Sequence, residues 1–242
     1  GEPEVEGEGG EGYLYIFEGT GTSFTQEYQS PNINAALGIT IAELDGSLYP
    51  EIGVATGYEE VIDPTAGTSE LHGNVRVYGY SGSSYGSEWN SNDLGDIVGG
   101  IASGDLGGTN DYLVIGTGGD SRNNNEVSGE VIVYKRSGAS YITDGVIIDT
   151  ERYRAYGIAV GDVDNDGDTE IAVGTGDFED LKPTVTVYDG NSRIAEYSKT
   201  VDTSSIWGIE INDFDSDGFT ELIYGTSGGE IFLYDGETED YE

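Results

Sequence analysis

The chain has 242 residues, 36% of them hydrophobic, which is enough to bury a sizeable core and excludes a disordered protein. Asp and Glu number 47 against nine Lys and Arg, and the resulting formal charge of -38 excludes duplex nucleic acid as a partner, because phosphate contacts need a basic surface. No apolar run approaches the roughly 18 residues of a membrane-spanning helix, and the acidic excess is typical of proteins adapted to concentrated salt, which screens charge repulsion.

The first part of the chain is an acidic segment followed by two strand patterns. Residues 1–12, GEPEVEGEGGEG, are expected to form a flexible acidic leader or linker. The segments GYLYIFEG from Gly12 and SFTQEYQ from Ser23 each predict a short strand. Together they resemble the outer half of the repeated unit that follows.

Four repeats follow, starting near residues 37, 99, 156 and 207. Each begins with Gly-Ile after a mostly bulky residue, as in Leu37-Gly38-Ile39. An acidic loop and an apolar run ending in Gly-Thr or Ala-Thr come next, and then a strand that ends in Tyr, such as EVIVYK from Glu130. A more polar fourth strand follows in most copies. Tyr156 and Trp207 share one repeat position and are expected in the core.

Four short antiparallel strands in about 50 residues are typical of one blade of a β-propeller. The predicted fold is therefore all-β: a single propeller domain over residues 13–236, with four readable repeats plus an N-terminal half blade, and an acidic tail at 237–242. The sequence holds five third-strand patterns but only four innermost strands. Three explanations stay open: a half blade left from a longer propeller, an unusual closure by the termini, or a ring completed by another chain or by further sequence.

The unit resembles the FG-GAP repeat of integrin α propellers and bacterial VCBS-type proteins. Here the FG position is YG or WG, the acidic loop reads DxDxDGxxE, and the GAP position is GTG or GTS. The resemblance extends over about residues 11–236 and is most specific in the last two copies. It implies that each acidic loop joins the first two strands of a blade and binds Ca²⁺.

The loops themselves agree with calcium, which takes six to eight oxygen ligands, including carboxylates and backbone carbonyls. We expect two calcium sites and a weaker third, with the second repeat free of metal because Gly107 replaces a ligand. An EF-hand is excluded because its twelfth position would fall inside a strand pattern. The expected ligands are Asp162, Asp164, Asp166, Glu170 and the Asp168 carbonyl; Asp213, Asp215, Asp217, Glu221 and the Phe219 carbonyl; and, in the weaker set, Glu43, Asp45, Ser47, the Tyr49 carbonyl and Glu51.

A ligand surface is expected on the face opposite the acidic loops, built from the long loops 57–73 and 118–129. Arg152, Tyr153 and Arg154 stand together in a chain poor in cations, and they either bind a carboxylate ligand or form internal ion pairs. Trp89 lies outside the repeated pattern and is a candidate ligand contact. The single His, His72, is expected to be a solvated loop residue.

The predicted function is a non-catalytic, calcium-stabilised propeller that acts as an extracellular or cell-surface binding or adhesion module for a protein or carbohydrate in a halophile. No His, Lys or Cys accompanies the acidic loops, so no catalytic residues are predicted. Two alternatives remain. One is a structural subunit of a filament or particle, which would self-associate through an incomplete blade. The other is a lyase-like enzyme acting on polysaccharides, which would need Arg152, Arg154 and His72 in one cleft.

Overall fold

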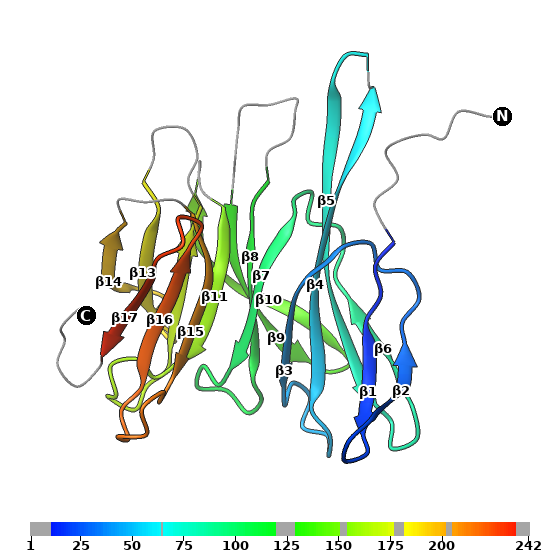
Figure 1. The fold of residues 1–242 in the computed structure, drawn as a ribbon, viewed down its shortest axis with the longest axis horizontal. Coiled ribbons are helices and arrows are strands. Elements are labelled where there is room, and N and C mark those ends of the chain that lie inside the picture. Colours follow the sequence, from blue (N-terminus) through cyan, green and yellow to red (C-terminus); the bar gives the residue numbers. More distant parts are fainter. Residues whose placement is uncertain are drawn as a thin grey trace.

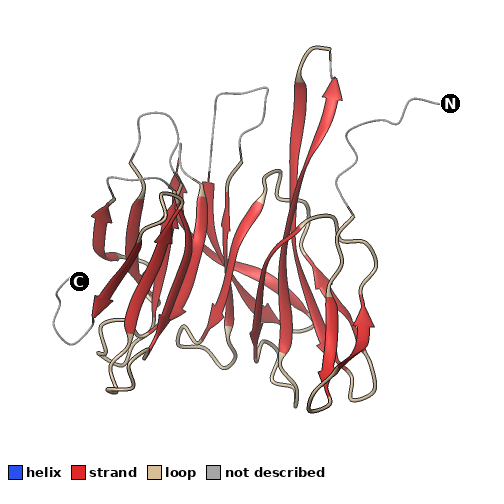
Figure 2. Cartoon of the chain, viewed as in Figure 1, coloured by secondary structure: helices blue, strands red, loops and turns tan. Residues whose placement is uncertain are grey.

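The computed structural model describes residues 11–63, 65–119, 129–150, 154–176, 182–201 and 205–235, which form strands, turns and loops (Figure 2). Residues 1–10 of the expected leader and the expected tail lie outside these ranges. None of the described residues belongs to a helix that could cross a bilayer.

The strands form antiparallel sheets in chain order, as predicted, and each sheet is one blade (Figure 1). The half blade pairs β1 with β2, blades 1 to 3 have four strands each, and three strands of blade 4 are described. The bounds are β1 Tyr15–Gly19 and β2 Phe24–Gln29; β3 Ala36–Ala42, β4 Glu51–Asp63, β5 Thr68–Tyr80 and β6 Tyr85–Asn90; β7 Val98–Gly104, β8 Tyr112–Thr117, β9 Gly129–Ser137 and β10 Ser140–Thr150; β11 Ala155–Gly161, β12 Glu170–Thr175, β13 Thr184–Asp189 and β14 Ala195–Thr200; β15 Ile206–Asn212, β16 Glu221–Thr226 and β17 Ile231–Asp235.

The first strand of every blade carries the same irregularity. Its register against the second strand shifts between Ala36 and Gly38, and at the three equivalent pairs of residues in the other blades. A bulge of this kind inserts one extra residue and increases the local twist. The Gly of the Gly-Ile motif thus marks a repeated bend in the innermost strand.

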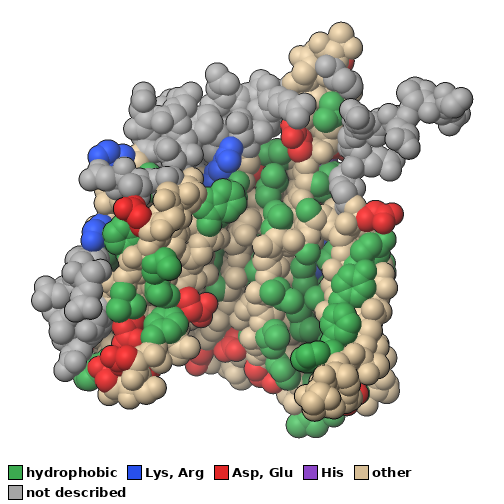
Figure 3. Space-filling model, viewed as in Figure 1, with side chains coloured by type: hydrophobic (Ala, Val, Ile, Leu, Met, Phe, Trp, Pro, Cys, Tyr) green, Lys and Arg blue, Asp and Glu red, His purple; other side chains and the backbone are tan. Residues whose placement is uncertain are grey.

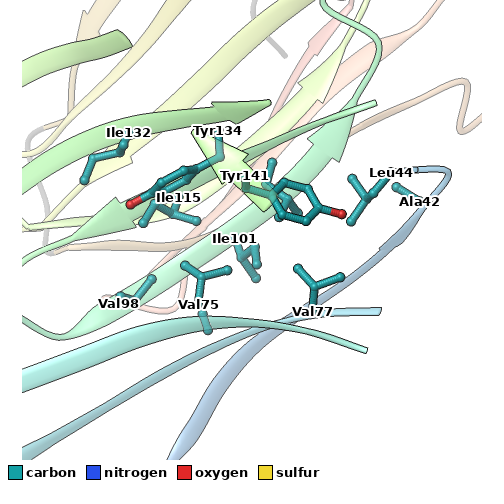
Figure 4. Close-up of a cluster of buried hydrophobic side chains, with 12 residues drawn as sticks. Ala42, Leu44, Val75, Val77, Val98, Ile101, Ile115, Ile132, Tyr134 and Tyr141 are labelled. Atoms are coloured by element: carbon teal, nitrogen blue, oxygen red, sulfur yellow. The ribbon is translucent and has the colours of Figure 1, made fainter. Parts of the chain in front are cut away.

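The hydrophobic core is divided among the contacts between neighbouring sheets. One cluster joins blades 1 and 2, and Figure 4 shows Val75 and Val77 of blade 1 facing Ile115, Tyr134 and Tyr141 of blade 2. Similar clusters join blade 2 to blade 3, blade 3 to blade 4, and the half blade to blade 1. In the described part of the chain, no core cluster joins blade 4 to blade 1 or to the half blade.

Glycines allow the inner strands to approach one another closely. A methyl group added at Gly38, Gly100 or Gly157 would lie 2.9, 2.8 or 3.3 Å from the Ile of the next blade's Gly-Ile motif. These three isoleucines, at most 9% exposed, fill the space that the missing Cβ atoms leave. The motif is therefore a packing device between blades.

Two sequence expectations were wrong. The segment 57–73 is not a long loop, because β4 and β5 continue as a hairpin that projects beyond the other strands (Figure 1). His72 consequently lies on a strand. Trp207 is not a core residue: its ring lies 5.1 Å from that of Tyr156, yet the side chain is 60% exposed.

Candidate metal centre

The four acidic loops connect the first and second strands of the blades and lie together at the lower end of the view in Figure 1. Figure 3 shows acidic side chains gathered at the same end. Loop 1 is residues 43–51, loop 2 is 105–111, loop 3 is 162–170 and loop 4 is 213–221. The strand pairing thus gives all four loops equivalent positions in the fold.

A buried glutamate closes loops 1, 3 and 4 in the same way. Glu51, Glu170 and Glu221 begin the second strand of their blades and are at most 4% exposed. The Oε2 atom of each accepts a hydrogen bond from the backbone N–H seven residues earlier, at N–O distances of 2.8, 2.7 and 2.7 Å. The carboxylate thereby ties the start of the loop to its end.

Local hydrogen bonds hold two further carboxylates in each of loops 3 and 4. In loop 4 the Oδ1 of Asp215 accepts from the N–H of Asp217, at 3.0 Å, and the Oδ2 of Asp213 accepts from the N–H of Gly218, at 3.1 Å. Loop 3 repeats both contacts at 3.2 and 3.1 Å. Gly167 and Gly218 have φ values of 95° and 98°, which favour glycine at these turns.

These contacts gather three sets of carboxylates whose ligand oxygens lie within 4.8 Å of one another. Calcium binds oxygen at 2.3 to 2.6 Å, so two oxygens across one ion are separated by about 5 Å or less. The sets have the dimensions of a calcium site. They are Asp213, Asp215, Asp217 and Glu221 in loop 4; Asp162, Asp164 and Glu170 in loop 3; and Glu43, Asp45 and Glu51 in loop 1.

Several predicted ligands stand outside these sets. The Oδ1 of Asp166 accepts from the N–H of Asp168, at 2.8 Å, and Phe219 donates its N–H to Asp217 in the same way, at 2.9 Å. In loop 1 the hydroxyl of Ser47 donates to the Tyr49 carbonyl at 2.8 Å. The carbonyl ligands predicted at Asp168, Phe219 and Tyr49 stay predictions.

The charge balance of the sets favours a cation. Burial and the neighbouring carboxylates raise the pKa of Glu51 to about 7 and that of Glu170 to about 8, although each accepts a backbone N–H that opposes the shift. Burial also raises the pKa of Glu221. The Oδ1 of Asp162 is buried and accepts no hydrogen bond. A divalent ion would neutralise these carboxylates and occupy the free lone pairs, so the residues fit calcium.

Loop 2 is built differently, because Tyr112 replaces the closing glutamate. Asp111 accepts the Glu43 N–H on Oδ2 at 3.2 Å and donates its own N–H to the Glu43 carbonyl at 3.0 Å. Asp105 accepts two backbone N–H groups of its own loop. Both carboxylates of loop 2 thus participate in backbone contacts, and those of Asp111 join loop 2 to loop 1.

Loops 3 and 4 are also joined, which sequence reasoning missed. The Oδ1 of Asn165 accepts the Thr220 N–H at 2.9 Å, and the Thr220 hydroxyl donates to the carbonyl of Asp162. Asn165 adopts a φ of 61°, unusual for a residue other than glycine. The signal in the sequence was the polar residue between two ligands, but its partner 55 residues away becomes visible only in the folded chain.

Of the predicted ligand-binding residues, the structure describes Arg154 and Trp89. Arg152 and Tyr153 lie outside the described residues. Burial raises the pKa of Asp96 to about 6, and the positive charge of Arg154 opposes this rise. Trp89 packs between blades 1 and 2, with its ring 5.6 Å from that of Tyr134 and 4.9 Å from that of Tyr141. Trp89 therefore has a packing role that its irregular place in the sequence concealed.

His72 forms a polar cluster on the projecting hairpin. Its Nδ1 lies 2.5 Å from Asp93, its Nε2 lies 3.2 Å from Glu60, and its ring stacks on Tyr58 at 4.9 Å. The hydrogen bond to Asp93 raises the pKa of His72. His72 is thus held by two carboxylates instead of being a solvated loop residue.

Comparison with known proteins shows similarity in fold to solved structures and no similarity in sequence to a known family. No family model and no curated protein matches the sequence. Among solved structures, Sqt1 of Saccharomyces cerevisiae has 10% identity and a TM-score of 0.49, with 96% of this chain and 67% of that chain covered. The Dos1 propeller has 13% identity and a TM-score of 0.55, and the match covers 89% of this chain but 49% of that one. This chain therefore spans about half of the Dos1 propeller chain. At such identity the likeness concerns the fold alone, and it agrees with the strand pairing: the chain is a four-blade β-propeller.

Proposed function

We propose that the chain is a non-catalytic, calcium-stabilised propeller of the FG-GAP type that acts as a binding or adhesion module. The observation that carries this proposal is the threefold recurrence of one carboxylate cluster closed by a buried glutamate. A functional site unique to one blade would not recur at equivalent positions. Recurrence at the same turn of three blades supports a role in stabilising the loops.

Calcium would act on the fold through the closing glutamates. Without a cation, Glu170 is buried beside Asp162 and Asp164, and like charges in a buried place are costly. An ion bound to all three carboxylates would offset that cost and hold β11 to β12 at the turn. None of the acidic loops carries a His, Lys or Cys, so the metal has no neighbouring base or nucleophile to activate.

The ligand surface is proposed at the end of the blades opposite the acidic loops. The hairpin of β4 and β5 projects there (Figure 1), and it carries His72 and Glu60, whereas the second carboxylate, Asp93, lies in the loop after β6. Functional surfaces often form on projecting segments held by a rigid scaffold. A protein or carbohydrate ligand suits a surface built from hairpins and loops in this way.

The charge of the chain supports a salty medium, and an extracellular or cell-surface setting is part of the proposal. A formal charge of -38 destabilises a compact chain at low ionic strength, and the Debye length falls to about 3 Å at 1 M salt. Calcium would add a specific stabilisation to this general screening, because it binds at defined positions of the fold.

Calcium titration with thermal unfolding in molar NaCl tests the proposal. The protein is compared with the double variant Asp164→Ala plus Asp215→Ala, and with a charge-matched control, Glu18→Ala plus Glu27→Ala, on exposed positions of the half blade. Ligand at 100 times its Kd stabilises by about 2.7 kcal/mol per site, which is roughly 5 to 11 °C in a chain of this size.

We expect calcium to raise the melting temperature of the protein and of the control, and the site variant to lose most of that gain. If calcium leaves the melting temperature of the unaltered protein unchanged, the acidic loops are not structural calcium sites and the proposal fails. If the site variant responds as the control does, the ion binds elsewhere.

A further inference from the structure

The contact between neighbouring blades repeats as a matched pair of motifs. Ile101, Ile158 and Ile209 each pack against the Gly of the preceding blade's motif. A second contact recurs one strand further out, where an added methyl at Gly174 would lie 2.4 Å from Ile206 and one at Gly116 would lie 2.0 Å from the Ala155 carbonyl oxygen. Each blade thus presents isoleucine on one face and glycine on the other.

In the described part of the chain, one isoleucine face and one glycine face have no partner blade. On blade 1, Ile39 holds the position of the three buried isoleucines but is 58% exposed, and Ile41 beside it is also exposed. On blade 4, methyl groups added at Gly208 and Gly225 would meet no atom within 4 Å. The first blade has an isoleucine face without a glycine partner, and blade 4 has a glycine face without an isoleucine partner.

We infer that a second copy of this chain covers these faces, with the glycine face of blade 4 in one copy packed against the isoleucine face of blade 1 in the other. The interface would continue the contact that already joins each pair of neighbouring blades, with Ile39 of one copy on Gly208 of the other. It is head-to-tail, so two copies can close into a ring and more can form a chain. The inference does not depend on calcium binding.

The half blade leaves the inner part of this docking surface open. Leu14 and Ile16 of the half blade cover Ile52, Val54 and Tyr78 on the second and third strands of blade 1, in one core cluster. They do not cover Ile39 on the first strand, as its exposure shows. The inner places beside β3 are therefore free to receive β15 and β16 of a second copy.

After docking, β15 and β16 of one copy and the half blade of the other would form one blade. Two strands, β1 and β17, could then serve as its third strand. Tyr28 of β2 packs on Tyr78, at 6.1 Å between rings, as Trp89 packs on Tyr134 one blade later. By this equivalence β2 is a fourth strand and β1 a third strand, the place that β17 holds in blade 4. Only one of β1 and β17 can occupy it after docking.

Self-association should depend on the salt concentration. Each copy carries a formal charge of -38, so two copies repel strongly at low ionic strength. The docking face of blade 1 offers Ile39 and Ile41, which are apolar, and the face of blade 4 carries the exposed Glu210 two residues after Gly208. Salt screens the charge repulsion without weakening the apolar contact. Association should therefore strengthen between dilute buffer and about 1 M NaCl, where the Debye length is near 3 Å.

Sedimentation velocity over a concentration series in molar NaCl tests the inference. Ile39→Asp places a charge on the isoleucine face of blade 1. Gly208→Val adds a side chain to the glycine face of blade 4, where the isolated chain has room for it. Each is expected to weaken self-association at least about tenfold, since a buried Ile contributes a factor of that order. Ile194→Asp, on an exposed turn of blade 3, is the matched control and should associate like the unaltered protein.

Mixing the two variants identifies the geometry. The Ile39→Asp chain keeps an unaltered blade 4, and the Gly208→Val chain keeps an unaltered blade 1. These two unaltered faces can pack together, so the mixture should form a dimer with one interface, which neither variant forms alone. A monomeric unaltered protein at all concentrations overturns the inference, as does association that both variants retain. A monomer whose melting temperature falls with Ile39→Asp would mean that the chain closes on itself, which also overturns it.

Discussion

The contrast between Gly100 and Gly208 gives a test of the open end of the propeller. Both glycines stand at the same repeat position, and neither has a positive φ, so alanine suits the backbone of either. An alanine Cβ at Gly100 would lie 2.5 Å from the carbonyl oxygen of Tyr156 and 2.8 Å from Ile158. At Gly208 it would meet no atom within 4 Å. The two substitutions therefore differ only in what faces them.

The magnitudes follow from that difference. Overpacking against backbone costs about 1 to 3 kcal/mol, so Gly100→Ala should lower the melting temperature by roughly 2 to 12 °C for a chain of this size. Gly208→Ala should stabilise by about 0.4 to 1 kcal/mol, because alanine restricts the unfolded chain and clashes with nothing. Its melting temperature should rise by roughly 1 to 4 °C.

Thermal unfolding followed by circular dichroism measures both variants, in molar NaCl at fixed calcium and at a protein concentration low enough to keep the chain monomeric. Urea unfolding supplies the free energies independently. If Gly208→Ala destabilises as strongly as Gly100→Ala, a blade packs against Gly208 within the isolated chain, and our account of the open face is refuted.

Three further predictions concern the loops and the hairpin. Glu170→Gln should remove one bound calcium ion per chain, as counted by isothermal titration calorimetry, and an unchanged stoichiometry would contradict the role of loop 3. Asn165→Ala should weaken calcium binding at loop 4 in the Glu170→Gln background, because it removes the contact with Thr220, and an identical affinity in both chains would show that the loops are independent. The pKa of His72 should exceed 6.5, so the stability that its contact with Asp93 adds is present below pH 6.5 and is lost as pH rises through the raised pKa; an NMR titration midpoint at or below 6.5 would disprove this.

The repeats in the sequence predicted the blades because one unit recurs with its turns and alternation intact. The half blade was predicted from segments beginning at Gly12 and Ser23, and β1 and β2 lie there. The hairpin of β4 and β5 was missed because its polar residues read as a loop, whereas cross-strand pairing continues to Asp63 and Thr68. Trp207 was misplaced because its repeat position is not a buried one: Leu37 holds the same position in blade 1 and is 48% exposed, although blade 2 follows.

The sequence predicted the carboxylates within each acidic loop, but not the contacts between loops. Carboxylates at alternate positions, with a glutamate eight residues after the first, identify the three clusters from sequence alone. The bond from Asn165 to Thr220 could not be predicted, since it depends on how far two blades are rotated about their shared contact. Trp89 shows the same dependence, because its partners belong to the next blade.

The division of the core into clusters shared by neighbouring sheets makes the propeller a one-dimensional cooperative system. Each blade is held by the free energy of its own strands and by one or two adjoining contacts, as in an Ising chain. Among the residues that the structure describes, blades 1 to 3 have two such contacts each, whereas blade 4 and the half blade have one each. Local opening should therefore begin at the half blade and at blade 4, and the hydrogen bonds that join loops 3 and 4 should oppose the opening of blade 4.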